Sequence, residues 1–479
     1  MYTDYTYQDW LAASDTDRIA MLEKIVRDYK ASEDFKSGLT ANEYFRTDNT
    51  EVRNKMLMQP RAVEYKDNNG RTRKKSQPVK IAGNRVRSGF FPRFVIQQNQ
   101  FLLSNGVTLD NSDLKKRLGL GFDKQLERCG EKALLHGVCW GFWNYDHLEI
   151  IEAVKDGLSG AVALLDEETS EPMVLVQFWQ INNNRPLYLR VFSPDGVVKY
   201  RMGKEELEEI PDTRRPYVVR TQSDAYGPVE ITGENYGGRL PVVPLWASEE
   251  RRSELTLAIK SKIDLYDRIF SDFGDNLDRA NDVYWVLNNF GGTIDDVAEM
   301  LEQINRVKAV ANLTDGTGTS STAELKTVDV PYAARQTALD ILQKQLYSDF
   351  MALDMDALTG GSLTNVAIET ATANLNLKAD RYEWQVFRFV QGILALIGVE
   401  TEQIKFKRQT IANRSEIVQD IAVMRQDIDL ETALKLNPYI EDQSEIDSIM
   451  KNKDAEAHSG APSMGELEKM LAAANQAAQ

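Results

Sequence analysis

Cysteine and histidine are scarce in this chain of 479 residues, and their scarcity limits its chemistry. The two cysteines, Cys129 and Cys139, cannot build a disulfide framework and suit a reducing compartment. Three histidines, without a C-x-x-C or H-E-x-x-H pair, argue against a zinc site. Cys129, His136 and Cys139 are spaced by 7 and 3 residues on an apolar segment. This helical spacing predicts core packing rather than a metal site or a Cys–His nucleophile.

Phosphate-binding and membrane signals are also missing. The chain has no G-x-x-x-x-G-K-S/T pattern and no G-x-G-x-x-G between a strand and a helix, so we expect neither ATP hydrolysis nor a cofactor. One Gly-rich stretch consists of Asp315, Gly316, Thr317, Gly318 and Thr319. It has no lysine and no following helix, which indicates a loop. No secretory signal is present, and the longest nearly apolar run, residues 389–399, is too short to span a bilayer. These absences predict a soluble, intracellular protein.

Positive charge is in deficit. Acidic residues outnumber basic ones by 73 to 57, which gives a net charge of -16. This charge opposes tight binding to phosphate backbones, so a DNA ligand would be guided rather than gripped. The hydrophobic content of 42% is that of a folded protein, and the length predicts two or more structural regions.

Local patterns predict helices, a hairpin and a sheet in the first half. Ile19, Leu22, Ile25, Val26 and Tyr29 recur at three- and four-residue spacing, which predicts a helix.

A turn at residues 67–70 with a basic run at 71–75 predicts a hairpin with a solvated tip. A DNA-binding patch is the alternative, which we disfavour because no aromatic residue interleaves the charges.

The pattern of residues 84–110 predicts a helix that ends at a turn at 104–106. Short β-rich runs over 174–246 predict an antiparallel sheet.

A long amphipathic helix is predicted from Ser253, a candidate N-cap, to residue 278. Its apolar stripe consists of Leu255, Ile259, Ile263, Tyr266, Phe270, Phe273 and Leu277. A compact insert of strands and a helix follows, and then a second helix runs from Tyr332 to about Ala357. Two helices that flank a small insert predict an antiparallel hairpin with the insert at its tip.

A third, longer helix is predicted after the Gly360-Gly361 break, to about Leu396, with three or four short helices from Asn413.

Acidic residues gather on the other faces of the first long helix. They include Asp264, Asp267, Asp272 and Asp275. A solvated face is favoured over a catalytic carboxylate pair, but in a ring of subunits a solvated face can be the wall of a channel.

Three segments resemble the portal proteins of tailed phages, in particular the SPP1 type found in siphophages of Gram-positive hosts. They are Val95–Asp110, Leu240–Leu287 and Leu353–Leu394, and the second is the most specific. There the family's I-D-x-Y-D core and the polar residues that follow it are matched by Ile263, Asp264, Tyr266, Asp267, Ser271, Asp272 and Asn276.

The resemblance implies an α+β fold with an α/β wing, antiparallel stem helices, a small α/β clip, a long kinked helix and a helical crown. The implied boundaries are 1–250 for the N-terminal part of the wing, 251–280 for the first stem helix, 281–331 for the clip, 332–357 for the second stem helix, 358–366 for the tunnel loop, 367–410 for the long wing helix and 411–479 for the crown and tail.

The resemblance also implies a function without catalysis. About twelve copies would form a ring at one capsid vertex, through which double-stranded DNA is packaged and ejected. The implied partners are the terminase large subunit, which supplies the ATP chemistry, a head-completion adaptor, and the major capsid and scaffolding proteins, but no membrane. The protein would assemble in the host cytoplasm and end in the virion.

Three groups of residues are site candidates on this interpretation. The tunnel loop would touch DNA and consists of Thr359, Gly360, Gly361, Ser362, Leu363, Thr364 and Asn365. The channel would be lined by acids among Asp264, Asp267, Asp272 and Asp275, and the clip loop 315–319 would bind terminase and adaptor. The alternatives are an ordinary helix–helix turn for the tunnel loop and, for the chain, another structural head or connector protein, or an enzyme with a carboxylate site.

Overall fold

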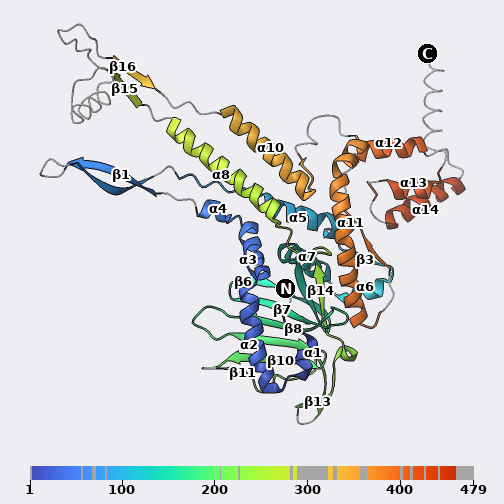
Figure 1. The fold of residues 1–479 in the computed structure, drawn as a ribbon. Coiled ribbons are helices and arrows are strands. Elements are labelled where there is room, and N and C mark those ends of the chain that lie inside the picture. The colour runs from blue at the N-terminus through green and yellow to red at the C-terminus, as the bar shows by residue number, and fades with distance from the viewer. Residues whose placement is uncertain are drawn as a thin grey trace, which may run out of the picture. The chain divides into compact units, whose positions relative to one another are not determined.

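In the computed structural model the chain combines helices and strands (Figure 1), and its residues cluster into two compact units. Unit 1 comprises Met1–Ala352 and Lys378–Arg408, and unit 2 comprises Leu353–Leu377 and Gln409–Gln479. The residues that the structure describes are 3–54, 58–66, 72–80, 83–204, 206–224, 227–280, 284–288, 322–326, 332–355, 364–399, 403–409, 414–424, 428–437, 439–440 and 443–459. The predicted α+β class is confirmed.

Four helices open unit 1, and polar caps set where three of them begin. They are α1 (Tyr7–Ala12), α2 (Asp15–Ala31), α3 (Glu33–Phe45) and α4 (Thr50–Arg53). The hydroxyls of Thr6, Ser14 and Ser32 each accept a first-turn N–H that the helix leaves without a partner. The helix predicted from apolar spacing is α2, and the buried members of its stripe are Leu22, Ile25, Val26 and Tyr29.

A six-stranded antiparallel sheet forms the centre of unit 1. Its order is β11-β10-β9-β8-β7-β6, with β6 (Val154–Asp156), β7 (Ser159–Leu165), β8 (Pro172–Trp179), β9 (Tyr188–Ser193), β10 (Gly196–Met202) and β11 (Leu207–Glu209). Because side chains alternate between faces, Val162 and Leu164 of β7 pack with α1–α3, whereas Ala161 and Ala163 face the other way. Both faces are therefore apolar and need a cover.

A three-stranded sheet covers that other face. Its order is β14-β4-β5, with β4 (Val138–Asn144), β5 (His147–Glu152) and β14 (Val242–Trp246). Trp140 of β4 packs with the six-stranded sheet, and the alternate residues Cys139 and Trp143 pack with helices. Those helices are α5 (Phe90–Leu103), α7 (Phe122–His136) and α11 (Asn365–Leu396). Unit 1 thus has four layers: helices, six strands, three strands and helices.

One sequence prediction in this region is wrong, and a second is confirmed with a different division into sheets. Cys139 lies on β4 and not on a helix, because α7 ends at His136 and Gly137 takes a left-handed φ of 85°. The antiparallel strands predicted over 174–246 are confirmed, but they belong to three sheets. Within this run β12 (Val218–Asp224) and β13 (Gly227–Glu234) form a separate hairpin, η1 (Tyr236–Gly238) follows, and β14 returns to pair with β4.

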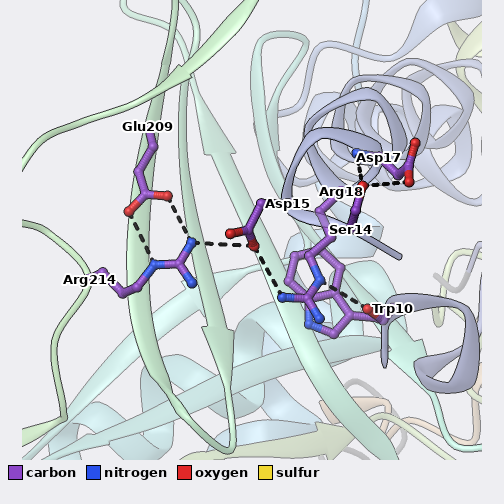
Figure 2. Close-up of polar contacts among 7 residues, drawn as sticks. All are labelled: Trp10, Ser14, Asp15, Asp17, Arg18, Glu209 and Arg214. Atoms are coloured by element: carbon purple, nitrogen blue, oxygen red, sulfur yellow. Dashed lines mark hydrogen bonds and ion pairs between the residues drawn. The ribbon is translucent and has the colours of Figure 1, made fainter. Parts of the chain in front are cut away.

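Figure 2 shows how the start of α2 is attached to the edge of the six-stranded sheet. The Arg214 guanidinium donates to both carboxylate oxygens of Glu209, at 2.9 and 3.3 Å, and lies 3.7 Å from Asp15. Asp15 is also 3.5 Å from Arg18, whose side chain donates to the carbonyl of Trp10 and lies over its ring. Exposed pairs of this kind stabilise little singly, so we interpret the network as an attachment and not as a reactive site.

The helices α8 (Leu257–Ala280) and α10 (Tyr332–Phe350) form an antiparallel pair. Phe273 near the end of α8 lies 5.2 Å from Tyr332 at the start of α10, between ring centroids, and Lys262 near the start of α8 pairs with Asp349 near the end of α10. The predicted helical hairpin is therefore confirmed. Of the predicted insert, the structure describes β15 (Tyr284–Asn288) and β16 (Thr322–Lys326), which pair antiparallel. The helix and second strand predicted between them lie outside the described residues.

Three predicted helix boundaries are wrong. The helix α8 begins at Leu257 and not at Ser253, because Thr256 is the cap: its hydroxyl accepts the N–H of Ile259 at 3.3 Å. The helix α10 ends at Phe350 instead of about residue 357, where Met351 takes a left-handed φ of 59°. Residues 84–89, predicted as helix, are not helical.

The remaining elements complete both units. The predicted hairpin is confirmed as β1 (Met58–Lys66) paired with β2 (Thr72–Lys80), and its turn lies outside the described residues. The strand β3 (Val107–Leu109) precedes α6 (Ser112–Leu118) and pairs with β17 (Ile404–Phe406). In unit 2 the later helices are α12 (Arg414–Met424), α13 (Leu430–Leu436) and α14 (Gln443–Ser459). None of the helices within the described ranges combines the length and apolarity that crossing a membrane requires.

Candidate functional site

The predicted channel-lining acids lie on α8, and the structure gives them different environments. Asp267 has no exposed surface and Asp275 is 6% exposed, whereas Asp272 is exposed and Asp264 lies between these extremes. A buried carboxylate is not available to a passing ligand. Asp267 and Asp275 are therefore explained first by what they hold inside the chain.

Asp267, Ser271 and Asp275 bind the backbone of residues 84–88. The carboxylate of Asp275 accepts the N–H of Asn84 at 2.7 Å, and the carboxylate of Asp267 accepts the N–H of Ser88 at 2.9 Å. Between them the hydroxyl of Ser271 accepts the N–H of Val86 at 3.1 Å. We call these three contacts the amide ladder.

The amide ladder follows from matching repeats. Four residues of an α-helix rise about 6 Å, and two residues of a chain in extended form span about 6.6 Å. Side chains at 267, 271 and 275 therefore meet alternate amides, at 88, 86 and 84, of a segment that runs antiparallel to the helix. Gly274 permits the close approach, because a Cβ built there would lie 3.2 Å from the Asn84 side chain.

Burial has an electrostatic cost at Asp267. Burial raises the pKa of its carboxyl, and the hydrogen bonds from Ser88 and Asn49 act in the opposite direction. One helical turn away, Asp264 pairs with Lys260 at 2.7 Å and accepts a hydrogen bond from the Tyr44 hydroxyl.

The sequence did not indicate the amide ladder, because the residues that it joins are distant in the chain. The only signal was the four-residue repeat of polar residues at 267, 271 and 275.

Aromatic packing fixes the base of the helix pair. The ring of Phe90 lies edge-on to Tyr266 at 4.9 Å, and the ring of Phe94 stacks on Phe350 at 4.7 Å. The guanidinium of Arg93 donates to the Tyr347 hydroxyl at 2.7 Å. The helix α5 therefore holds α8 and α10 together where they join the core.

The two candidate loops fall largely outside the described residues. This applies to all of Asp315–Thr319 and to Thr359–Leu363. Thr364 and Asn365 are described: Asn365 is the first residue of α11, and the hydroxyl of Thr364 accepts the N–H of Ala367 at 3.3 Å. Thr364 thus caps the long helix.

The cysteine and histidine cluster is part of the core. Cys129, His136 and Cys139 are all buried, and the ring of His136 is 3.0 Å from the side-chain oxygen of Asn42. Burial lowers the pKa of His136 to about 3 and raises that of Cys139, so neither is prepared for nucleophilic or base chemistry. Core packing is confirmed for these side chains. Among the described residues, no group of three or more His, Cys, Asp or Glu side chains is placed to hold a metal ion.

Comparison with known proteins gives one consistent result. The family model described as "Phage portal protein, SPP1 Gp6-like" matches residues 14–459. A portal protein of Clostridium phage phiCD119 is 23% identical over 444 residues, which cover 83% of this chain and 89% of that protein. A portal protein of Bacillus phage SPP1 is 30% identical over 407 residues, which cover 76% of this chain and 74% of that protein.

Proposed function

Since the chain belongs to the SPP1 Gp6-like family of phage portal proteins, we propose that its copies form a ring around a channel for double-stranded DNA at one vertex of the capsid. The observation that carries the proposal is the family match, which extends over residues 14–459 and includes the antiparallel pair α8 and α10. In this role the protein is a structural component of the virion, assembled in the host cytoplasm, and needs no cofactor.

Exposed apolar residues on the helix pair support assembly. Phe270 and Leu277 on α8 are 37% and 45% exposed, and Ile341 on α10 is 50% exposed. They lie farther toward the insert end of the helix pair than Tyr266 and Tyr347, which α5 contacts. A neighbouring copy in a ring of about twelve would cover such residues by the same heterologous contact at every interface.

Charge supports a channel that does not retain DNA. Asp272 is the exposed acid of the four on α8, so we assign to it the channel-lining role first predicted for the group. Acid next to phosphate is repulsive, and the repulsion reaches about 8 Å at physiological salt. The tunnel-loop residues Thr359–Asn365 bring small uncharged side chains, which contact phosphates by hydrogen bonds without strong attraction.

Docking of partners completes the proposal. We assign the segment between α8 and α10, with its Gly-rich residues Asp315–Thr319, to contacts with the terminase large subunit and with the head-completion adaptor that replaces it. The major capsid and scaffolding proteins would meet the ring from the capsid side during assembly.

Negative-stain microscopy of the purified chain tests the function. We expect rings with a central hole in the absence of ATP and metal, since no motif for either is present. Light scattering that shows only a stable monomer at micromolar concentration would contradict the ring. Closed particles without a hole would favour another structural head or connector protein.

A further inference from the structure

A lysine ammonium is buried where three helices meet. The Nζ atom of Lys378, on α11, lies 2.8 Å from a carboxylate oxygen of Glu254 and donates to the carbonyl oxygen of Phe350 at 2.9 Å. It also lies 3.2 Å from the centre of the Phe350 ring. The side chains of Lys378 and Glu254 are 13% and 17% exposed, so water screens this pair less than the exposed pairs of the surface. Burial lowers the pKa of Lys378, and the Glu254 carboxylate opposes that shift.

Both partners of Lys378 stand at helix ends. Phe350 is the last residue of α10, where carbonyls have no partner within the helix and the helix dipole favours a cation. Glu254 lies just before α8, and its N–H donates to the carbonyl of Leu134 on α7 at 3.0 Å. One ammonium thus joins the exit of α10, the entry to α8 and α11.

The hydrogen bond between Lys378 and Phe350 also joins the two ends of the segment between α10 and residue 378. The chain belongs to unit 1 up to Ala352 and again from Lys378, while Leu353–Leu377 belongs to unit 2. Phe350 and Lys378 therefore stand at the two points where the chain leaves and re-enters unit 1. The hydrogen bond between them holds these points together.

Stability alone does not account for a charge at this position. The neighbouring α11 residues Leu375, Ala379 and Tyr382 are buried, and replacing a buried ion pair by apolar residues is often neutral or stabilising. The charge instead specifies one position of α11. A shift of α11 by one turn, about 5.4 Å, would take the ammonium away from both the Glu254 carboxylate and the Phe350 carbonyl. The adjacent pair Arg381–Glu250 is 71% and 60% exposed, and breaking it costs little.

We propose that Lys378 is a positioning residue, which sets the register of α11 against α8 and α10. It thereby holds in place the two ends of the segment that joins α10 to α11. Its relevance to DNA rests on the proposed function, in which this segment carries the tunnel loop.

Hydrogen exchange followed by mass spectrometry tests the positioning role on the full-length protein without DNA. The variants are Lys378→Met, the double variant Lys378→Met/Glu254→Gln, and Arg381→Met as the control on the neighbouring exposed pair. Lys378→Met leaves a buried carboxylate without its cation and should lower the thermal midpoint, which the double variant should restore. We expect exchange of the amides in 365–377 to rise about tenfold in both Lys378 variants and to stay unchanged in Arg381→Met.

The double variant separates positioning from stability. If its exchange matches that of the unaltered protein, Lys378 only neutralises Glu254 and the proposal is overturned. In packaging assays we expect the double variant to form rings but to package DNA less well, and normal packaging would also overturn the proposal. If the unaltered protein forms no ring, the proposed function fails, while the exchange result still decides the role of Lys378.

Discussion

Removal of the Asp267 side chain should release residues 84–88 from α8. In Asp267→Ala, the backbone N–H of Ser88 loses the carboxylate oxygen that accepts it at 2.9 Å. The side-chain amide of Asn49 loses a hydrogen bond to the same carboxylate. Asp267 itself has no exposed surface. A buried donor left without a partner costs about 1–3 kcal/mol. Two such donors give a cost of about 2–6 kcal/mol.

The electrostatic state of Asp267 reduces that figure. Burial raises the pKa of its carboxyl, so the ionised form is disfavoured in the folded protein, and its removal returns part of this cost. We therefore expect a net destabilisation near the lower limit, about 2–3 kcal/mol. The pH dependence has a definite sign. Because the folded pKa lies above the unfolded one, the stability contributed by Asp267 falls as the pH rises from the unfolded pKa through the folded one. The alanine variant loses this dependence.

Urea unfolding and hydrogen exchange at residues 84–88 measure the effect, with Asp272→Ala as the matched control. Asp272 lies on the same helix but is exposed, so its removal should change stability by less than about 0.5 kcal/mol. Ser271→Ala, which removes the middle contact of the amide ladder, should cost about 1 kcal/mol. The reasoning is refuted if exchange at 84–88 is unchanged in Asp267→Ala, or if Asp272→Ala destabilises the protein equally.

Four further outcomes are expected. Asp272→Lys should make DNA retention in the ring stronger and more salt-dependent, whereas Glu168→Lys, at an exposed turn between β7 and β8, should not; equal behaviour of the two would place Asp272 away from DNA. Cross-linking of Ser362→Cys between neighbouring copies should block DNA passage reversibly and leave the ring intact, and packaging through a fully cross-linked ring would exclude a constriction there. Deletion of residues 314–322 should spare assembly but weaken terminase binding, which a pull-down measures; unchanged binding would remove this loop from the docking surface. Burial of His136 lowers its pKa to about 3, so the unfolded chain takes up its proton first, and stability should fall by about 1.4 kcal/mol per unit as the pH drops below about 6.5. The stability of His136→Gln should fall less steeply below about pH 6.5, as acid unfolding would show. An equal loss of stability in both proteins would contradict the reasoning.

Amphipathic periodicity was sufficient to predict the helices that pack against a core. The stripe of α2 and that of α8 follow directly from apolar residues at three- and four-residue spacing. Helix ends were less predictable, since they depend on distant contacts. Ser253 is a good cap by composition, but the helix starts after Thr256, whose hydroxyl accepts the N–H of Ile259 and whose carbonyl accepts the N–H of Lys260.

The environment of polar residues could not be predicted from their own element. Acids on the face of a helix opposite an apolar stripe are usually solvated, yet Asp267 and Asp275 are buried because residues 84–88 present backbone amides to them. Those amides lie 191 and 179 positions away in sequence, and no local pattern encodes the pairing. Lys378 was missed for a related reason. A single lysine in a long helix gives no sign of burial until Glu254 and Phe350 are known to lie beside it.

The pairing of β14 with β4 has a consequence for the order of folding during synthesis. The strands β6 to β11 each neighbour the next in sequence, so their sheet needs only short loop closures and can form early on the ribosome. The three-stranded sheet is completed only when Val242–Trp246 has emerged, because that strand pairs with Val138–Asn144. Until then the face made by Ala161, Ala163, Leu175 and Phe192 lacks part of its cover. A nascent chain that pauses before residue 242 therefore presents an apolar sheet surface to chaperones and to other nascent chains.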